Sequence, residues 1–452
     1  MNDLLPNYLS QGERARLFPV LSNSSKEGRT TSIVLACLEK VDEFGAQLLA
    51  TLGQKRGVRT RVEAFTEVVF NNAKSAPNLR PDGMIVLSSG QKTWRALIES
   101  KIGASEIDAG QVENYRKLAK EFGVDCVVTI SNQFATVPNQ HPDQDVAKSK
   151  SKVPVFHWSW MHILTQVDLL LTNEGVEDRD QRLLLNELRR FLSHESAGVK
   201  GFDRMPKEWT ELNRLVMAGG AIPARSPEAR AVVDAWHQES RDLSLILSRM
   251  LETRVDERHS KKFKSNRQAR IDATFESLRE TNQLTSSWDI PDAAAPLDLT
   301  VDLSRRTVEV GMLIKAPLDR VSTKARLNWV LRQLKSVEDP SVHIRLLWPG
   351  RNDPTQATLA ELREDPDCAA QGMDHLAAHG FYVFSSHRPG QRFLQQVNFI
   401  TDLEKVVPDF YRDVGSNLVA WKKPPPKVKS DRKTSQDVST SALSEDASEF
   451  SE

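Results

Sequence analysis

One stretch of the sequence combines carboxylates and a lysine at spacings that could hold a metal ion. Residues 80–102 read RPDGMIVLSSGQKTWRALIESKI, two apolar runs on either side of the short segment SSGQ. A type II′ hairpin turn requires glycine at its first central position, so we expect a hairpin centred on Gly90 and Gln91. In this register Asp82 faces Glu99, and directly opposed residues have Cβ atoms about 4.5–5.5 Å apart. The sequence therefore predicts two neighbouring carboxylates at the open end of the hairpin.

A third charged side chain joins this pair. Because side chains alternate along a strand, Glu99 and Lys101 point to the same face. Opposed carboxylates repel unless a cation lies between them, and Mg²⁺ is usually held by one or two carboxylates with water and substrate phosphates. Mn²⁺ could substitute for it. Lys101 could then orient or deprotonate a water molecule, or stabilise charge on a phosphate. The alternative is an exposed strand end with a simple Lys–Glu ion pair, because patterns this short recur by accident.

The elements around the hairpin predict an α/β unit. Apolar spacing predicts a helix over 30–52 and another over 106–122 that ends at Gly123. Runs of β-branched, aromatic and apolar residues predict strands at 61–70, 82–87, 92–102 and 124–130. The predicted order is therefore α-β-β-β-α-β.

The helix predicted over 106–122 carries a polar residue inside its apolar stripe. Gln111 shares a face with Ile107, Tyr115 and Phe122. A buried amide needs hydrogen-bond partners, so we expect a polar group opposite Gln111. The alternative is that Gln111 lies at the rim of the stripe and is hydrated.

These residues and this order resemble a known family, the PD-(D/E)xK nuclease superfamily, which has the restriction-endonuclease-like fold. The matching residues are Pro81-Asp82, Glu99-Ser100-Lys101 and the Gln-x-x-x-Tyr element from Gln111 to Tyr115. This last element is similar to the subgroup that includes the nuclease domain of recombination helicase-nucleases. The resemblance covers about residues 25–160, about a third of the chain.

The resemblance implies a role for each matching residue. In the superfamily the Asp and Glu bind Mg²⁺ and the Lys assists the attacking water. This implies that Asp82 and Glu99 are metal ligands and that Lys101 is catalytic. In the subgroup the Gln and Tyr shape the site and contact substrate, which implies the same for Gln111 and Tyr115.

Many members of the superfamily also use a Glu from the first helix at the metal site. We favour Glu27, which follows a candidate N-cap at Ser25 and could reach the end of the sheet. Glu39 and Glu43 lie further along the helix and could equally belong to a solvated face.

The function expected from the residues and the resemblance is that of a Mg²⁺-dependent nuclease that hydrolyses phosphodiester bonds. DNA is favoured as the substrate on family grounds, in defence, repair or restriction. The alternative is a nucleic-acid-binding or regulatory protein that retains a degenerate nuclease fold and does not cut. The intact Asp/Glu/Lys set argues against that alternative.

Any nucleic-acid partner must be held by local basic patches, because 61 Lys and Arg residues balance 61 Asp and Glu residues. Lys55, Arg56 and Arg59 precede the strand at 61–70 and could contact phosphates near the catalytic end of the sheet; a solvated loop is the alternative. Segment 254–270 contains seven Lys or Arg. As a helix it would form a surface for the nucleic-acid backbone, and the alternative is a charged linker helix. The candidate contacts in it are Lys261, Lys262 and Lys264.

The length of 452 residues predicts two or three domains. We expect a nuclease-like domain over 1–175, a mainly helical connector over 176–283, a second α/β domain over 284–421 and a disordered tail, first basic and then acidic, over 422–452. The second α/β domain has a glycine at position 311, where a catalytic lysine would be expected, so we interpret it as non-catalytic. It would provide target choice or contacts with a protein partner or a second copy of the chain.

Other features exclude several classes of protein. Three widely separated cysteines exclude CxxC zinc spacing and a disulfide framework, and no GxxxxGK[ST] loop of an ATPase motor occurs. The N-terminal residues lack the apolar region of a signal peptide, and the longest apolar runs are too short to span a bilayer. We expect a soluble, cytoplasmic protein without a membrane partner.

Overall fold

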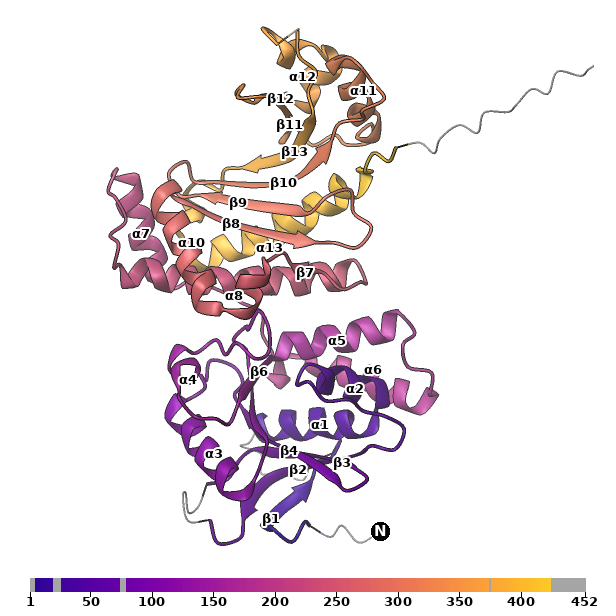
Figure 1. Cartoon of the computed structure of the whole chain (residues 1–452), viewed down its shortest axis with the longest axis vertical. Coiled ribbons are helices and arrows are strands. Elements are labelled where there is room, and N and C mark those ends of the chain that lie inside the picture. Colours follow the sequence, from indigo (N-terminus) through magenta and orange to yellow (C-terminus); the bar gives the residue numbers. More distant parts are fainter. Residues whose placement is uncertain (1–4, 19–25, 74–78, 374, 424–452) are drawn as a thin grey trace, which may run out of the picture.

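The computed structural model describes residues 5–18, 26–73, 79–373 and 375–423. It is a mixed α/β structure in two parts, each built on its own β-sheet, and Figure 1 shows them as two lobes along the long axis. One sheet has six strands of mixed direction, and the other has seven antiparallel strands. Within the described residues, no helix combines the length and apolar character needed to cross a membrane.

The first lobe is organised around the six-stranded sheet. Its strands follow their sequence order: β1 (Leu9–Arg14), β2 (Arg61–Phe70), β3 (Gly83–Ser89), β4 (Lys92–Ser100), β5 (Cys126–Ser131) and β6 (Val155–Ser159). Strands β1 to β4 are antiparallel to their neighbours, whereas β4, β5 and β6 run parallel. Strand β5 is buried at every position, as its near-continuous apolar run predicts for a central strand covered on both faces. Strand β1 was not predicted.

The predicted register of the hairpin is confirmed. Ser89 pairs with Lys92, and Met84 pairs with Leu97. Gly90 has a φ of 60°, the sign that the first central position of a type II′ turn needs. One further step along the ladder places Asp82 across from Glu99.

Helices cover both faces of this sheet. The helices of the first lobe are α1 (Lys26–Lys40), α2 (Asp42–Ala50), α3 (Ala109–Phe122), α4 (Gln144–Lys148), α5 (Trp160–Thr172), α6 (Arg179–Leu192) and the short 3₁₀ helix η1 (Glu195–Ala197). Helices α1, α2, α5 and α6 pack on one face, and α3 and α4 pack on the other.

The single helix predicted over 30–52 is two helices that meet at Val41, which has an extended backbone (φ −105°, ψ 111°). The break is formed by a side chain distant from it in sequence. Arg56 Nη1 donates to the carbonyl of Leu38 at 2.8 Å, and Nη2 donates to that of Glu39 at 3.0 Å. Arg56 also contacts Gly45, where any side chain would clash with it. The periodicity of 30–52 contains no sign of this contact.

The expected connector over 176–283 does not form a separate unit. Helix α6 buries Leu185, Leu188 and Leu192 in the core of the first lobe, which therefore extends past residue 175. The later helices of that range pack into the core of the second lobe. An amphipathic helix must bury its apolar face against one of the two sheets, and these helices divide between them.

The second lobe is organised around the seven-stranded sheet. Its strands, in spatial order, are β12 (Thr355–Thr358), β11 (Val342–Leu347), β13 (Gly380–His387), β10 (Thr307–Lys315), β9 (Leu297–Asp302), β8 (Gln283–Asp289) and β7 (Asp256–Glu257). Its helices are α7 (Glu208–Met217), α8 (Pro227–Met250), α9 (Lys261–Ser265), α10 (Arg267–Thr281), α11 (Thr323–Gln333), α12 (Leu359–Glu364) and α13 (Gln396–Asp413), with 3₁₀ turns η2 (Cys368–Ala370), η3 (Gly390–Leu394) and η4 (Gly415–Asn417).

Two features of the second lobe differ from what its sequence suggests. Pro291 and Pro296 favour a loop over residues 284–297, but β8 occupies most of the first half of that range. Its polar sequence buries only Leu284 and Trp288, and the indole of Trp288 donates to the Ser240 carbonyl of α8 at 3.1 Å. Segment 254–270 is not one helix, because it contains β7, α9 and the start of α10. Most of the expected tail, residues 424–452, lies outside the described residues.

Candidate active site

Asp82 lies just before β3 and is held by the strand opposite. Its Oδ2 accepts hydrogen bonds from the backbone N of Ser100 at 2.7 Å and from the Ser100 hydroxyl at 3.0 Å. That hydroxyl also lies 2.6 Å from Thr31 Oγ1 on α1. The carboxylate of Asp82 is therefore fixed by β4 and, through Ser100, by α1. Neither Ser100 nor Thr31 was predicted to have this part, because nothing in their local pattern distinguishes them.

Glu99, near the end of β4, contacts the lysine that follows it. Its side chain is 1% exposed, and Lys101 Nζ lies 2.5 Å from its Oε1. The other carboxylate oxygen, Oε2, is buried and has no partner in hydrogen-bond geometry, although the Tyr115 hydroxyl lies near enough to Glu99 to oppose the rise in its pKa. A buried, unpartnered carboxylate oxygen is costly, and a cation would relieve that cost.

The lysine also joins a third carboxylate to this group. Lys101 Nζ donates to Glu27 Oε1 at 3.1 Å and to the Ser100 carbonyl at 3.0 Å. Glu27 lies in the first turn of α1, so the structure brings the favoured glutamate to the site. Glu39 lies elsewhere, because it pairs with Arg14 at 2.7 Å.

The backbone of Lys101 is also anchored. Its N–H donates to the Ile130 carbonyl of β5 at 2.8 Å, and its carbonyl accepts from Trp160 Nε1 at 2.8 Å. Trp160 is fully buried and begins α5. The sequence contained no signal for this contact, which restricts where the lysine can project.

Helix α3 adds the predicted amide and phenol. Gln111 Nε2 donates to the hydroxyl of Tyr115 at 2.9 Å, so the polar partner of Gln111 lies one turn along the same helix and not opposite it, as was expected. Tyr115 is 1% exposed. Burial raises the pKa of Tyr115, and the negative charges of Glu99 and Asp82 raise it further. The phenol therefore keeps its proton beside the carboxylates.

The charges of the site are not balanced. Burial, and then the charge of Glu99, raise the pKa of Asp82 to about 7. Burial also raises the pKa of Glu99, although the hydrogen bond from Lys101 opposes that shift. Burial lowers the pKa of Lys101, but the hydrogen bond and charge of Glu99 outweigh this and leave it raised. Three carboxylates thus share one ammonium group.

The donor set fits a hard cation that takes most of its ligands from outside the protein. Asp82 and Glu99 would hold it, and the unpartnered oxygen of Glu99 is the clearest place for it. Neither at this site nor elsewhere in the described ranges are three or more His, Cys, Asp or Glu side chains arranged to hold a metal ion. Mg²⁺ suits a site with only two protein carboxylates, because it usually retains several water molecules and binds substrate phosphates.

The predicted phosphate contacts before β2 lie at the wrong end of the sheet. Arg61 begins β2 and pairs with Ser88, whereas Gly83, next to Asp82, pairs with Thr66. Lys55 and Arg59 are exposed in the segment just before Arg61. Ser88 and Gly83 are five residues apart on β3, roughly 17 Å, so this segment lies at the opposite end of the strand from the carboxylates.

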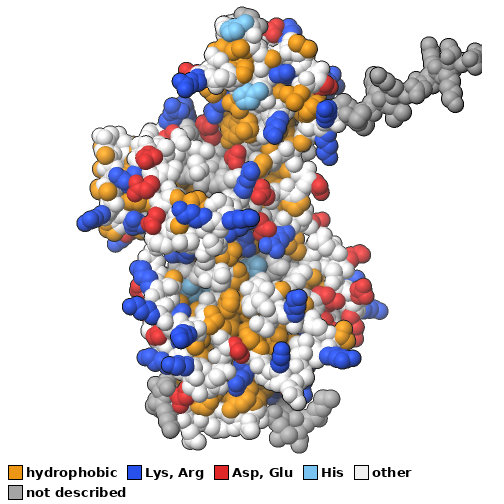
Figure 2. All heavy atoms as spheres, viewed as in Figure 1, with side chains coloured by type: hydrophobic (Ala, Val, Ile, Leu, Met, Phe, Trp, Pro, Cys, Tyr) orange, Lys and Arg blue, Asp and Glu red, His pale blue; other side chains and the backbone are white. Residues whose placement is uncertain are grey.

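Arg56 is not available to contact phosphates either. Its side chain is only 12% exposed because it binds the carbonyls at the end of α1. In the second lobe, Lys261, Lys262 and Lys264 are exposed on α9. Figure 2 shows one face of the whole molecule, on which Lys and Arg side chains are mixed with Asp and Glu, with several at the junction of the lobes.

Comparisons of this chain with models of protein families, with curated proteins and with solved structures found no match. The resemblance to the PD-(D/E)xK superfamily therefore rests on the residues and geometry described above.

Proposed function

We propose that the first lobe is a Mg²⁺-dependent nuclease of the PD-(D/E)xK type, with a restriction-endonuclease-like core. The observation that carries this proposal is the convergence of Asp82, Glu99 and Lys101 at one end of the sheet, with the Oε2 atom of Glu99 buried and unpartnered. Glu27 on α1 and Tyr115 on α3 enclose the same group. The mixed sheet with helices on both faces supports the fold assignment.

Each side chain has a distinct part in phosphodiester hydrolysis. Asp82 and Glu99 would hold a magnesium ion, which supplies positive charge against the phosphate oxygens. Ser100 keeps Asp82 in place through two hydrogen bonds. Lys101, next to both ligands, would orient or deprotonate the attacking water, or stabilise charge on the phosphate.

Supporting residues restrict the site around these groups. Gln111 holds the phenol of Tyr115 next to the carboxylates, where its hydroxyl can contact substrate. DNA is the proposed substrate because of the family resemblance. The exposed lysines of α9 are the proposed contacts to its backbone, and the second lobe is the proposed source of target choice or protein contacts.

The test is a cleavage panel of linear, circular and single-stranded DNA and of RNA, with Mg²⁺, Mn²⁺ or chelator. We expect cleavage of at least one DNA substrate that needs a divalent ion and is lost in Glu99→Gln. Glu364→Gln, which changes an exposed glutamate of the second lobe, should cut like the wild type. Cleavage that persists in chelator or in Glu99→Gln would contradict the proposal.

One observation favours a second candidate function. Lys101 already neutralises part of the charge of Glu99 and Glu27, as it would in a protein that binds nucleic acid without cutting it. This candidate predicts DNA binding without cleavage under every metal condition. It also predicts that adding Mn²⁺ raises the melting temperature of the wild type no more than it raises that of Glu99→Gln.

A further inference from the structure

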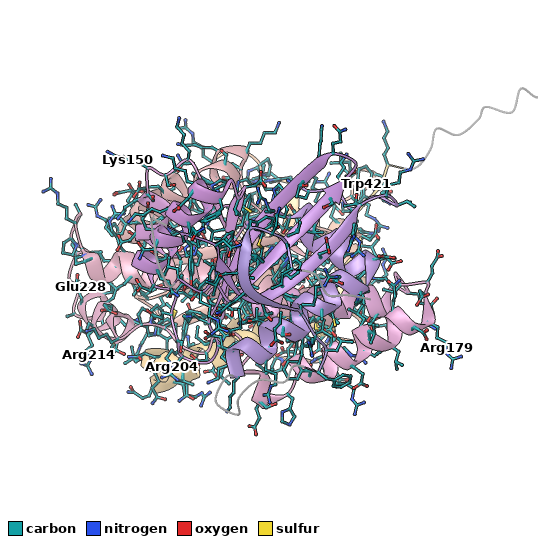
Figure 3. The ribbon with its side chains drawn as sticks, turned by 90° about the horizontal axis from the view of Figure 1, so that it is seen from below. Lys150, Arg179, Arg204, Arg214, Glu228 and Trp421 are labelled. Atoms are coloured by element: carbon teal, nitrogen blue, oxygen red, sulfur yellow. The ribbon has the colours of Figure 1, made fainter. Side chains whose placement is uncertain are left out.

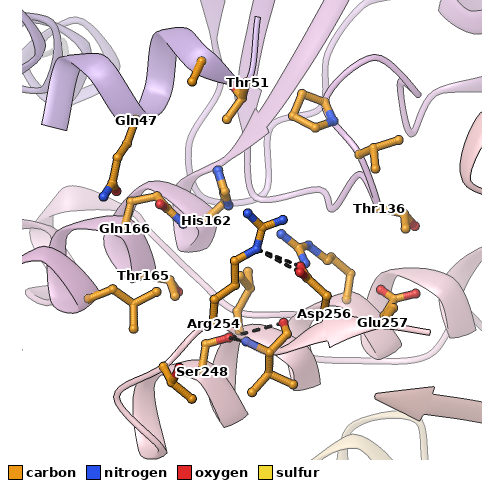
Figure 4. A pocket seen from close by; sticks show the side chains of 18 of the residues that line it. Gln47, Thr51, Thr136, His162, Thr165, Gln166, Ser248, Arg254, Asp256 and Glu257 are labelled. Atoms are coloured by element: carbon orange, nitrogen blue, oxygen red, sulfur yellow. Dashed lines mark hydrogen bonds and ion pairs between the residues drawn. The ribbon is translucent and has the colours of Figure 1, made fainter. Parts of the chain in front are cut away.

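A pocket lies between the two lobes, and none of the carboxylate-site residues lines it. Its volume is about 770 Å³, within the usual range for small-molecule sites, which often occur at domain interfaces. Helices α2 and α5 of the first lobe form one wall, and α8, β7 and the residues around them form the other. Figure 4 shows Gln47, Thr51, His162 and Gln166 facing Arg254 and Asp256 across it.

The interface that contains the pocket is held by polar contacts. The cores of the two lobes are separate clusters. Arg249 Nη1 donates to Thr165 Oγ1 at 2.9 Å, Gln140 Nε2 donates to the Lys264 carbonyl at 2.8 Å, and the Phe134 N–H donates to Gln238 Oε1 at 3.2 Å. Polar interfaces of this kind resemble transient protein contacts more than a hydrophobic core, so they leave room for an occupant.

The pocket has more positive than negative charge on its walls. Two contacts within the lining involve charged side chains: Arg254 pairs with Asp256 at 2.9 Å, and His259 Nε2 lies 2.7 Å from Glu257 Oε2. Arg241 also lines the pocket, and among the described residues it has no ion pair; its Nη1 donates only to Ser244 Oγ, at 3.1 Å, and the charges of Glu257, Asp256 and Asp242 act on it from beyond ion-pair distance. Lys264, at the rim, has no side-chain partner in the described part of the chain. An anionic group would compensate these charges.

His162 supplies an independent sign of a missing partner. It projects from α5 into the pocket, and both of its ring nitrogens are buried without a hydrogen-bond partner. Burial, and then the charges of Arg241 and Arg254, lower its pKa to about 3, so the ring is neutral and offers one donor and one acceptor. Buried polar atoms almost always have partners, so these two nitrogens indicate a bound molecule or ordered water.

We propose that this interlobe pocket binds a phosphate-bearing small molecule of about nucleotide size. Its phosphate would lie against Arg241 and Lys264, because guanidinium and ammonium groups are the usual partners of phosphate. His162, Gln47 and Gln166 would hydrogen-bond its neutral part. A continuous nucleic-acid backbone fits less well, because Arg241 and Lys264 are the only lining Lys or Arg side chains among the described residues without a paired carboxylate, which suits one phosphate group and not a run of them.

Calorimetric titration with inorganic pyrophosphate and with ADP tests this site, on the full chain without divalent metal or nucleic acid. Because these conditions need no cleavage, the result is independent of the proposed nuclease function. We expect saturable binding of at least one probe at constant ionic strength. Arg241→Gln and, separately, Lys264→Gln should weaken that binding at least about tenfold, as loss of a charge-assisted contact does.

The control is Arg214→Gln, which makes the same change on α7, where Arg214 projects outward (Figure 3). It should bind the probe like the wild type. Lys264 is exposed, so its variant tests the site even if Arg241→Gln does not fold. The proposal is overturned if neither probe binds, or if binding is equal in the wild type and both pocket variants. It is also overturned if Arg241→Gln weakens DNA binding at fixed salt while probe binding is unchanged, because the arginine would then belong to the substrate path.

Discussion

The β3–β4 hairpin of the first lobe and the β9–β10 hairpin of the second lobe both bring acidic residues together, but they treat the charges differently. In the second lobe, Asp302 accepts hydrogen bonds from Gln283 at 3.0 Å and from the backbone of Arg305 at 2.8 Å, and Glu309 pairs with Arg345 at 3.5 Å. Each of these carboxylates has its own partner. In the first lobe, Asp82 is held by Ser100, but Glu99 and Glu27 beside it share the single ammonium group of Lys101.

The position equivalent to the lysine shows the same contrast. A side chain at Gly311 would meet Cβ of Phe384 at 2.6 Å and the ring of Tyr382 at 2.7 Å. Those aromatic residues cover the strand, and Arg345 lies over the Phe384 ring. Acidic residues on neighbouring strands are therefore not enough to identify a metal site. What distinguishes the first hairpin is that its carboxylates, together with Glu27, outnumber the positive charges around them.

The largest expected effect is at Asp82. Asp82→Asn should reduce cleavage by more than the roughly 100-fold that loss of an outer-shell partner of a metal site causes, because a metal ligand itself is changed. Asp302→Asn, the corresponding change in the second hairpin, should leave the single-turnover rate within about twofold of the wild type. Equal losses in the two variants would remove the distinction between the hairpins.

A slightly smaller loss is expected at Lys101. Lys101→Ala should slow single-turnover cleavage about 10²–10³-fold, the usual result of removing one group that stabilises charge in the transition state. Binding of Mn²⁺ should persist because both carboxylates remain, and it can be followed by the metal-dependent rise in melting temperature. Arg345→Ala, which removes the β11 partner of Glu309 in the second hairpin, is the control and should keep the wild-type rate. A wild-type rate in Lys101→Ala would show that this lysine has only a structural ion pair.

The deficit of positive charge also predicts a pH dependence of stability without metal. Because the folded-state pKa of Asp82 is raised from 3.8 to about 7, the folded protein retains this proton over that interval more than the unfolded chain does. The stabilisation is fully present below the unfolded value and is lost as pH rises through about 7.

Asp82→Asn cannot lose that proton. Its free energy of unfolding relative to the wild type should therefore rise between about pH 5 and about pH 8, by on the order of a few kcal/mol. Urea unfolding in chelator measures this, and Asp319→Asn, the same change at an exposed aspartate of the second lobe, is the matched control. A constant difference for Asp82→Asn would mean that the carboxylate is not destabilised.

The smallest effect is expected from the anchor of the lysine backbone. Trp160→Phe removes the hydrogen bond to the Lys101 carbonyl and should cost about 1 kcal/mol of stability. Cleavage should fall about tenfold or less, because Lys101 keeps its ion pairs but is held less firmly. Trp236→Phe, which removes the indole bond to the Thr285 carbonyl in the second lobe, should cost similar stability and leave cleavage unchanged. Equal cleavage losses in the two tryptophan variants would show a general effect of stability.

Local pattern was enough to predict much of the candidate site. The hairpin register follows from alternation and from the turn at Gly90, so the opposition of Asp82 and Glu99 was readable from the sequence. The contact of Gln111 with Tyr115 follows from helical spacing of four residues. These features depend on neighbours that the chain brings together within a few residues or across one tight turn.

Long-range packing decided the rest. The sequence by itself determined strands β2 to β5, the hairpin and the acidic, basic and aromatic residues of the site. Only the tertiary structure selected Glu27 over Glu39, put Lys55 at the far end of the sheet, and used Arg56 to divide the first helix. It also assigned α6 to the first lobe and formed the pocket between the lobes. The physical reason is that each of these outcomes depends on which distant groups compete for the same carbonyl, charge or apolar face, and no local period encodes that competition.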